Sequence, residues 1–345
     1  MSPNIFFFIP SSLWPDELPK DVAQNWAGFG LGLYAWTLQT CLRLQAAGLA
    51  CELTQQVPES GIVFCHSNVL RRMTIPPASR RLLVCIKAEA PRCALAPLHI
   101  VQNPLEASAG CYFMPHWPQP QLIARDRRRG DRFETLAFFG HAHSLAPELT
   151  TPAWEAALAA RGLRMHYIAN TNRWNNYQSI DTRWNDYHAI DAVIAVRTFN
   201  KWHQRLSSSF ISKPATKLYN AWLSGTIPIL GKESAYRAAG EPGENYIEVE
   251  TMESLLSWLD RLKADVDLRR SLIASGQQQA QQYTPENIVL QWKNFLSQVA
   301  LPAYEKWLSY SPARQQQILL AAQAASYRDR LWRRGREQLL KVIAS

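Results

Sequence analysis

Short apolar runs that alternate with longer amphipathic segments are the feature that most constrains how this chain can fold. Each apolar run is bounded by polar or proline-containing segments, and its length suits a buried strand. In the first part of the chain, strands are expected at residues 4–9, 61–64, 82–86 and 99–101, with a helix at 33–47. A strand-then-helix order of this kind is typical of a parallel sheet that is covered by helices on both faces.

A proline-rich stretch followed by a basic cluster interrupts this alternation near residue 115, and a second alternation begins after it. The second series predicts strands at 133–139, 165–168, 192–196 and 227–230 and helices at 154–161, 215–224, 252–262 and 266–282. A chain of 345 residues is long enough for two domains of ordinary size. We therefore expect an α/β protein with two Rossmann-like domains facing a cleft. The expected parts are an N-terminal domain at 1–118, a linker at 119–132, a second domain at 133–300 and a basic helical tail at 301–345.

The net charge of +9 comes from 37 basic and 28 acidic residues and favours an anionic partner. Nucleic acid, an acidic membrane surface and a phosphorylated small molecule all fit. The excess is uneven, because residues 314–345 hold seven Arg or Lys and two acidic residues and so supply +5 of the total. A charge gathered in one tail does not suit uniform coating of nucleic acid, so specific nucleic-acid binding is not expected. Hydrophobic residues make up 47% of the chain, which excludes global disorder.

All six cysteines lie in the first third of the chain, and no pair has the CxxC spacing of a redox or zinc site. Most of them sit inside apolar runs, so we expect buried reduced thiols. The N-terminus has no basic leader, and the apolar stretch 26–50 contains Gln39, Arg43 and Gln45, so neither a signal peptide nor a membrane span is expected. These features predict a cytoplasmic protein.

The segment 213–231, which reads KPATKLYNAWLSGTIPILG, is the most informative part of the sequence. Lys217 falls in the first turns of the expected helix, Asn220 lies one turn later, and Gly225 ends the helix just before a buried strand. The free N–H groups at a helix N-terminus favour an anion, and a lysine there adds a mobile charge that suits a diphosphate. The alternative is an ordinary surface lysine, which occurs before a buried strand in any α/β protein.

This segment resembles the donor-binding motif of GT-B-fold glycosyltransferases, either of the fucosyltransferase type or of the glycosyltransferase-family-1 type. It looks most like the fucosyltransferase pattern acidic-Lys-Leu-x-x-Ala-x-x-x-Gly-x-(Val/Ile)-Pro-(Val/Ile). The matching positions are Lys217, Leu218, Ala221, Gly225, Ile227, Pro228 and Ile229. Thr216 stands where the pattern has an acidic residue, and the spacing from Lys217 to Ala221 is one residue shorter than in many fucosyltransferases, which leaves the sugar open. The resemblance implies a nucleotide-diphosphate sugar as donor substrate, no cofactor, and a hydroxyl-bearing glycan, lipid or protein as acceptor.

Further donor-side candidates follow the expected strands of the second domain. The resemblance implies that Arg197, at the end of strand 192–196, pairs with Lys217 on the diphosphate; the alternative is an ordinary exposed arginine. Gly140 and His141 follow the first strand, where a backbone turn can approach a phosphate closely. Glu250 ends an expected strand at 246–249, where it could hold a ribose hydroxyl.

Three other patterns are interpreted as accidental or structural. Glu233 and Glu241 have E-x7-E spacing, but they follow the helix and strand that this motif precedes in retaining glycosyltransferases. The DxD spacing at 265–267 lies in a polar helical run and favours a solvated helix face. His141 and His143 have no third ligand nearby in the sequence, so no metal site is expected.

Candidate catalytic residues on the acceptor side are His66 and Glu89, which both follow expected strands of the first domain. Transfer to a hydroxyl with inversion needs a base that takes its proton. Glu89, in the run AEAP, weakly resembles the Glu-Ser-Pro segment of fucosyltransferases, and His66 is its competitor. A purely structural hydrogen-bonding role is the alternative for both residues.

An internal repeat relates residues 172–181 to 182–191, with six of ten positions identical. One interpretation is a duplicated turn on the surface of the second domain, since insertions there are well tolerated. The other is that Trp184, Asp186 and Tyr187 carry the function and the first copy extends the wall of the cleft.

The tail also has two interpretations. Leu320, Ala324, Tyr327 and Leu331 are spaced to share one face of a helix, in a stretch crowded with arginines. The helix either packs this stripe back across the first domain or presents a basic amphipathic surface to anionic lipid.

The sequence as a whole predicts a metal-independent glycosyltransferase, hexosyl- or deoxyhexosyl-transferring, in the cytoplasm and with peripheral membrane contact through its tail as one option. The rivals are a non-catalytic polyanion-binding or assembly protein and a GT-B-fold epimerase that acts on a nucleotide sugar.

Overall fold

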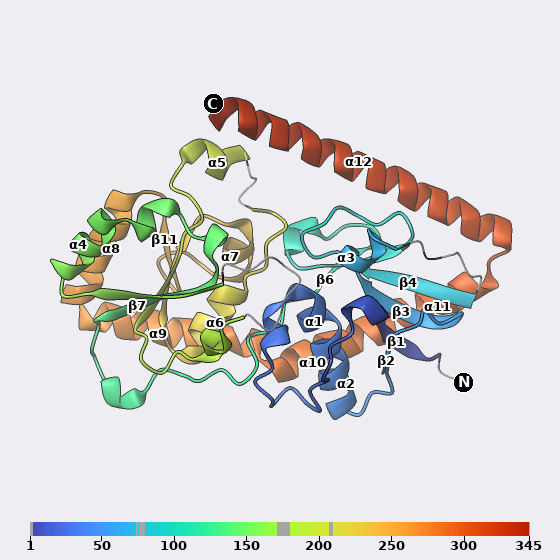
Figure 1. Ribbon diagram of the computed structural model, residues 1–345, viewed down its shortest axis with the longest axis horizontal. Helices are drawn as coiled ribbons and strands as arrows, with labels where there is room; N and C mark the ends of the chain where they lie inside the picture. Colours follow the sequence, from blue (N-terminus) through green and yellow to red (C-terminus); the bar gives the residue numbers. More distant parts are fainter. Residues whose placement is uncertain (1–2, 74, 76–79, 171–179, 207–209, 345) are drawn as a thin grey trace. The chain divides into compact units, whose positions relative to one another are not determined.

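The computed structural model describes residues 3–73, 75, 80–170, 180–206 and 210–344 (Figure 1). The chain divides into two compact units, each treated by itself. Unit 1 comprises Met1–Gln24, Leu31–His116 and Pro285–Ser345, and unit 2 comprises Asn25–Gly30 and Trp117–Thr284. Each unit contains one parallel sheet, so the expected α/β class with two Rossmann-like domains is confirmed.

Unit 1 contains a six-stranded parallel sheet in the order β2-β1-β3-β4-β5-β6. Its strands are β1 Ile5–Phe8, β2 Glu52–Thr54, β3 Ser60–His66, β4 Arg80–Ile86, β5 Leu98–Val101 and β6 Cys111–Phe113. Its helices are α1 Gly32–Trp36, α2 Leu38–Ala46, α3 Ser67–Leu70, α10 Pro285–Phe295, α11 Leu301–Ser309 and α12 Pro312–Ala344. The single helix expected at 33–47 is two helices, because the chain breaks at Thr37, whose hydroxyl donates to the Leu33 carbonyl at 2.6 Å.

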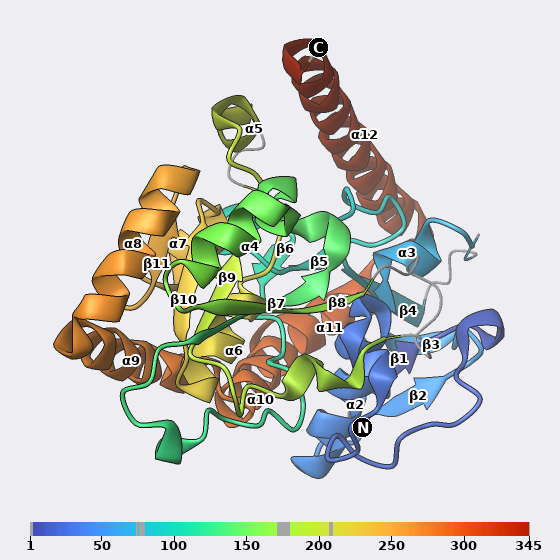
Figure 2. The ribbon, with the colours of Figure 1, turned by 60° about the vertical axis from the view of Figure 1, so that its left-hand side comes forward.

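Unit 2 contains a five-stranded parallel sheet in the order β11-β10-β9-β7-β8. Its strands are β7 Thr135–His141, β8 Arg164–Asn170, β9 Ala192–Ala195, β10 Ile227–Gly231 and β11 Ile247–Val249. Its helices are α4 Pro152–Ala159, α5 Lys201–Leu206, α6 Thr216–Ser224, α7 Ser234–Ala239, α8 Met252–Ala264 and α9 Val266–Ala280. Right-handed crossovers in opposite directions from β7 and β9 place α4 and α6 on opposite faces of this sheet (Figure 2).

Both sheets have the doubly wound strand order in which the second strand lies outside the first, as 2-1-3-4-5. In such sheets ligands bind at the carboxyl ends of the strands, beside the point where the strand order reverses. That point lies between β1 and β3 in unit 1 and between β7 and β9 in unit 2. The topology therefore indicates one edge in each unit where functional side chains are to be sought.

The division of the chain differs from the expected bounds at one large segment, since residues 285–300 belong to unit 1. Helix α10 returns to cover the unit 1 sheet, where the Trp292 ring meets the rings of Phe7 and Phe64 at centroid distances of 6.2 and 5.5 Å. On the next helix, α11, the Tyr304 hydroxyl donates to the Arg80 carbonyl at 3.0 Å. This apolar burial explains why the chain crosses back after unit 2 is complete.

The expected linker at 119–132 packs as part of unit 2, and its basic cluster is bound there. Arg125 and Arg129 both form ion pairs with the buried carboxylate of Asp191, at 2.9 and 2.7 Å. The same carboxylate accepts the backbone N–H groups of Glu134 and Thr135, each at 2.9 Å. Two of the five arginines of this cluster are thus internal structure and are not offered to a polyanion.

All six cysteines are free, and five of them are buried, as expected for reduced thiols. Within the described part of the chain, no helix is long and apolar enough to cross a membrane. The long helix α12 belongs to unit 1.

Candidate functional site at the carboxyl edges of the two sheets

The best-defined feature of the unit 2 edge is the contact between Lys217 and Gly140. Gly140 is the penultimate residue of β7, with a φ of +149° that side-chain-bearing residues rarely adopt. A Cβ added there would lie 3.1 Å from the Cε atom of Lys217 and 3.2 Å from its Nζ atom. The same ammonium lies 5.6 Å from the centroid of the Phe138 ring, a cation–π distance. The end of the Lys217 side chain therefore lies close to bare backbone at the strand end, and the φ of Gly140 favours glycine there.

Arg197 follows β9 at the same edge and is held by Glu233, which follows β10. The Nε atom of Arg197 donates to Oε1 of Glu233 at 2.8 Å, and the Glu233 side chain is only 1% exposed. The guanidinium also lies 5.6 Å from the centroid of the Phe210 ring. Oε2 of Glu233 accepts no hydrogen bond from any residue that the structure describes. The edge thus carries an oriented arginine and, beside it, a buried carboxylate oxygen with hydrogen-bonding capacity to spare.

The two other donor-side candidates are engaged elsewhere. The carboxylate of Glu250, just after β11, forms an ion pair with Lys232 at 2.9 Å on a partly exposed surface. Oδ1 of Asn220 accepts the backbone N–H of Gln119 at 2.9 Å, and its amide hydrogen-bonds the buried Tyr187 phenol. The structure therefore brings Lys217, Gly140 and Arg197 to one edge, whereas Asn220 fastens the incoming segment to α6.

His141 completes this edge through aromatic contacts. Its ring stacks on that of His143, with centroids 5.6 Å apart, and meets the ring of Trp184 edge-on at 5.3 Å. In the described part of the chain, no three His, Cys, Asp or Glu side chains gather as a metal-binding group. Asp265, of the DxD pattern, caps α9 by accepting the Leu268 N–H, so this pattern belongs to a helix end.

The repeat is described only in its second copy, since most of the first copy lies outside the described residues. Tyr187 is fully buried and stacks on Phe139 at 4.1 Å. Asp186 accepts the His188 N–H at 2.9 Å and so builds a turn. Two residues of the proposed functional copy touch site candidates, Trp184 against His141 and Tyr187 against Asn220.

The unit 1 edge carries His66 at the end of β3, where burial and then the neighbouring charge of His116 lower its pKa to about 4, against the opposing effect of Glu89. The backbone N–H of Asn68 donates to Nδ1 of His66 at 3.2 Å. The neutral ring therefore carries its proton on Nε2, a buried atom without a hydrogen-bond partner among the described residues. With this proton on Nε2, His66 is suited to donate a hydrogen bond and not to remove a proton.

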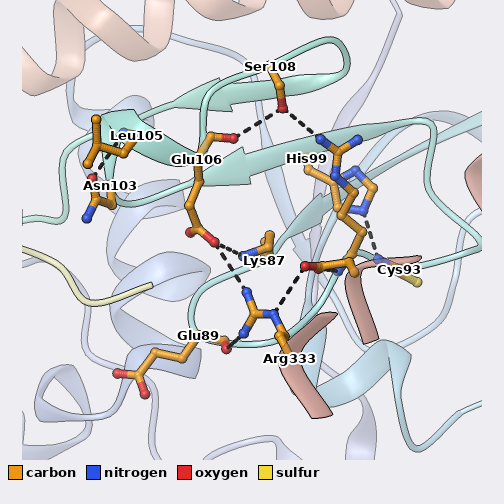
Figure 3. A network of polar contacts seen from close by, with 11 residues as sticks. Lys87, Glu89, Cys93, His99, Asn103, Leu105, Glu106, Ser108 and Arg333 are labelled. Atoms are coloured by element: carbon orange, nitrogen blue, oxygen red, sulfur yellow. Dashed lines mark hydrogen bonds and ion pairs between the residues drawn. The ribbon is translucent and has the colours of Figure 1, made fainter. Parts of the chain in front are cut away.

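Glu89 lies on an exposed turn after β4 that is held unusually firmly (Figure 3). The residue before it, Ala88, has a φ of +48°, which is strained for a residue with a Cβ. On one side, the buried Lys87 ammonium pairs with Glu106 at 2.5 Å. On the other, Arg333 of α12 donates to the Glu89 carbonyl at 2.8 Å and pairs with Glu106 at 3.2 Å. A strained turn that is fixed by buried charges is typical of a functional site.

Comparison with known proteins was made on sequence and on structure. No family model and no curated protein matches the sequence. Among solved structures, sucrose-phosphate synthase from Thermosynechococcus elongatus superposes with a TM-score of 0.57 over 86% of this chain and 99% of that chain, at 12% identity. The chain has the GT-B fold.

Two further GT-B glycosyltransferases align with lower scores. Anabaena HepE, crystallised in complex with UDP-glucose, gives a TM-score of 0.49 over 86% of this chain and all of that chain, at 13% identity. AviGT4, a glycosyltransferase involved in avilamycin A biosynthesis, gives 0.45 over 86% and 99%, at 14% identity.

Two features of this GT-B chain were missed by reasoning from the sequence. Glu233 lies just beyond a buried strand, as Arg197 and Glu250 do, and its E-x7-E spacing with Glu241 hides that position. Glu241 is exposed, away from the Arg197 pair, so the spacing itself carried no information. The role of Arg333 had no sequence signal, because it depends on how the tail helix lies against unit 1.

Proposed function

We propose that this protein is a glycosyltransferase that moves a sugar from a nucleoside-diphosphate sugar to a hydroxyl-bearing acceptor. The observation that carries the proposal is the placement of Lys217 against Gly140 at the carboxyl edge of unit 2, beside the Arg197–Glu233 pair. Two cations at the strand ends of a doubly wound sheet suit a diphosphate. The GT-B fold supports this choice among nucleotide-binding activities, and fold alone leaves donor and acceptor open.

In this proposal, the chain's own cations stabilise the leaving group. Negative charge develops on the diphosphate as the glycosidic bond to it breaks, and fixed positive groups lower the energy of that state. Lys217 provides a mobile ammonium and Arg197 a fork oriented by Glu233. These two residues would perform the charge stabilisation that a metal ion performs in metal-dependent enzymes.

Glu89 is assigned the role of base on the acceptor side. A carboxylate can take the proton of the attacking hydroxyl, whereas His66 holds its own proton on Nε2 and has a pKa of about 4. His66 is therefore assigned a hydrogen-bond donor role toward the acceptor or sugar. Its low pKa keeps it neutral near pH 7.

Binding of nucleoside diphosphates tests the donor site directly. We expect calorimetry with UDP, GDP and dTDP to show binding of at least one of them, and Lys217→Ala to weaken it roughly thirtyfold, because a charge-assisted contact to phosphate is lost. Lys263→Ala is the matched control, since Lys263 is an exposed lysine on α8 of the same unit. Equal affinity in the Lys217 variant and the control would contradict the assignment.

Transfer is tested with the nucleotide sugar that corresponds to the nucleotide bound. Incorporation of labelled sugar into a hydroxyl acceptor, lost in Glu89→Gln while the nucleotide still binds, is the expected result. Conversion of the nucleotide sugar without an acceptor would indicate an epimerase. The absence of nucleotide binding would favour a non-catalytic protein.

A further inference from the structure

Helix α12 has two faces of opposite character, and the polar one faces the protein. Ser326 donates to the Arg92 carbonyl at 2.7 Å, and Asp329 accepts the Arg92 N–H at 2.8 Å. One turn further on, Arg333 contacts the Glu89 turn and Glu106. Near the start of the helix, the Gln315 amide donates to the Trp307 carbonyl at 2.8 Å. Polar contacts along one side therefore fix α12 on unit 1.

The apolar stripe of α12 lies on the side away from these contacts. Leu320, Tyr327 and Leu331 are 54%, 64% and 49% exposed, and Ala324 between them is exposed as well. Of the two interpretations of the tail, the helix does pack on unit 1, but it does so through another side and not through this stripe. Exposed apolar side chains in register over three turns of a helix mark an interaction surface. We call this side, from Leu320 to Leu331 with its flanking residues, the outer face.

Arginines flank the apolar stripe on both sides. At 100° per residue, Arg328 lies on one side of the line from Leu320 to Leu331, and Arg330 and Arg334 lie on the other. All three are exposed. Asp329, the neighbouring acid, is turned toward Arg92 and Arg333 on the opposite side. Among the described side chains, the outer face is therefore apolar along its middle and cationic along both margins.

An exposed aromatic residue lies past the end of the stripe, on the same margin as Arg328. Trp332 is 52% exposed, and the guanidinium of Arg336 lies 4.5 Å from its ring centroid. Trp and Tyr are the residues that favour the interface between water and lipid headgroups, where an aromatic ring meets both environments.

We propose that the outer face of α12 docks on a membrane surface that contains anionic phospholipid, with the helix lying in the plane of the headgroups. The apolar stripe would enter the boundary of the acyl chains while Arg328, Arg330 and Arg334 remain among the lipid phosphates. A second copy of the chain fits poorly, because pairing two such helices along the stripe brings arginine margins together without acidic partners. The charge pattern thus selects an anionic surface.

The test is co-sedimentation of the full chain with vesicles. Vesicles of phosphatidylcholine alone are compared with vesicles that also contain phosphatidylglycerol, at low and at high salt. We expect binding to the anionic vesicles, little binding to the neutral ones, and release as salt screens the charges. The triple variant Arg328→Gln/Arg330→Gln/Arg334→Gln is expected to lower the partition coefficient roughly a hundredfold, since each arginine near the surface contributes about fivefold.

Matched variants test whether vesicle binding depends on the outer face or on charge and hydrophobicity anywhere on the protein. Arg71→Gln/Arg72→Gln/Arg127→Gln removes three exposed arginines elsewhere and should change binding little in comparison. Leu331→Asn should weaken binding, whereas Leu290→Asn, at a leucine of similar exposure on α10, should not. All variants alter exposed side chains, so unchanged thermal unfolding checks that the fold persists.

Three results would overturn the proposal. The wild type could fail to sediment with anionic vesicles at low salt, or both arginine triple variants could lose binding equally. Alternatively, sedimentation velocity could show a dimer that Leu331→Asn dissociates, which would assign the outer face to a second copy. The assay contains no sugar donor, so its outcome is independent of the proposed transferase activity.

Discussion

Two buried carboxylates of unit 2 lie at opposite ends of neighbouring strands, and they differ in how many of their hydrogen bonds are formed. Asp191, at the amino end of the strands just before β9, accepts hydrogen bonds from two arginines and from two backbone N–H groups. Glu233, at the carboxyl edge after β10, receives Arg197 through Oε1, and its Oε2 accepts no hydrogen bond from the described residues. Both side chains are about equally buried. Position in the sheet, and not burial, therefore distinguishes them.

The difference separates what the fold needs from what a ligand can use. A buried acceptor without a donor costs free energy, and folded proteins keep few of them. At the amino edge, where parallel α/β sheets bind no ligand, that cost is avoided completely. At the carboxyl edge it is tolerated beside Lys217 and Arg197, where a hydroxyl group of a bound nucleotide sugar could provide the missing donor.

Asp191→Asn should destabilise the fold strongly. Burial alone would raise the pKa of Asp191, but hydrogen bonds from Arg129, Glu134 and Thr135 outweigh it and lower the pKa below 3.8. Removing the charge leaves Arg125 and Arg129 without their partner, so we expect the free energy of unfolding to fall by about 3–5 kcal/mol. Urea unfolding measures it.

The pH dependence gives this prediction its sign. Because the folded pKa is lowered, the contribution of Asp191 is present above pH 3.8 and is lost as pH falls below that value. The wild type and the Asn variant should therefore converge in stability at acid pH. A constant difference between them down to the lowest pH at which both are folded would contradict this account.

Most of the fold could be predicted from the sequence because burial determines it locally. The buried strands are marked by short apolar runs, and the end of α6 is marked by Gly225. These local features do not depend on distant contacts. Which helix covers which sheet could not be predicted, because α10 packs on strands that lie hundreds of residues earlier in the chain.

The candidate site was predictable to the same extent. Strand ends indicated Gly140 and Arg197, and the helix-Gly-strand segment indicated Lys217; the structure places these residues at the carboxyl ends of the strands, and their role as a site stays a prediction. Side-chain pairing was not predictable: nothing local shows that Asn220 binds Gln119 or that Glu233 holds Arg197. The packing side of the tail helix could not be predicted for a related reason. An apolar stripe indicates the buried side of a helix only when no other side makes the contacts.

Glu233 should respond differently from Asp191, in ligand binding more than in stability. Glu233→Gln keeps an oxygen for Arg197 and replaces the second acceptor by a donor, so we expect the affinity for a nucleotide sugar to fall about tenfold, the value of one hydrogen bond to a charged group. The free energy of unfolding should fall less than in Asp191→Asn, because one arginine and not two loses its ion-pair partner. Calorimetry and urea unfolding of the same preparations measure both.

Pyrophosphate provides the control for Glu233. It carries the phosphate charges without any sugar hydroxyl, so its affinity should change much less than that of the nucleotide sugar. If both ligands lose affinity equally, Glu233 acts only by orienting Arg197, and its second oxygen has no ligand of its own.

The smallest expected effect concerns Glu106, a third buried carboxylate, which is intermediate between the other two. Its Oε1 receives Lys87 and Arg333, its Oε2 accepts no hydrogen bond from the described residues, and burial raises its pKa despite these cations. It lies beside the turn of Glu89, and Arg333 connects the two by donating to the Glu89 carbonyl.

Arg333→Lys keeps the charge but loses the fork that reaches both groups, so the turn should loosen. We expect kcat to fall about fivefold while donor affinity is unchanged, since only the position of the proposed base is affected. Arg334→Lys is the matched control. Arg334 is the next residue along the helix and is exposed on the outer face, so this change should leave kcat with a soluble acceptor unchanged. A fall in donor affinity equal to the fall in kcat would show instead that Arg333 supports the fold as Asp191 does, and Glu106 would then belong with the structural carboxylates.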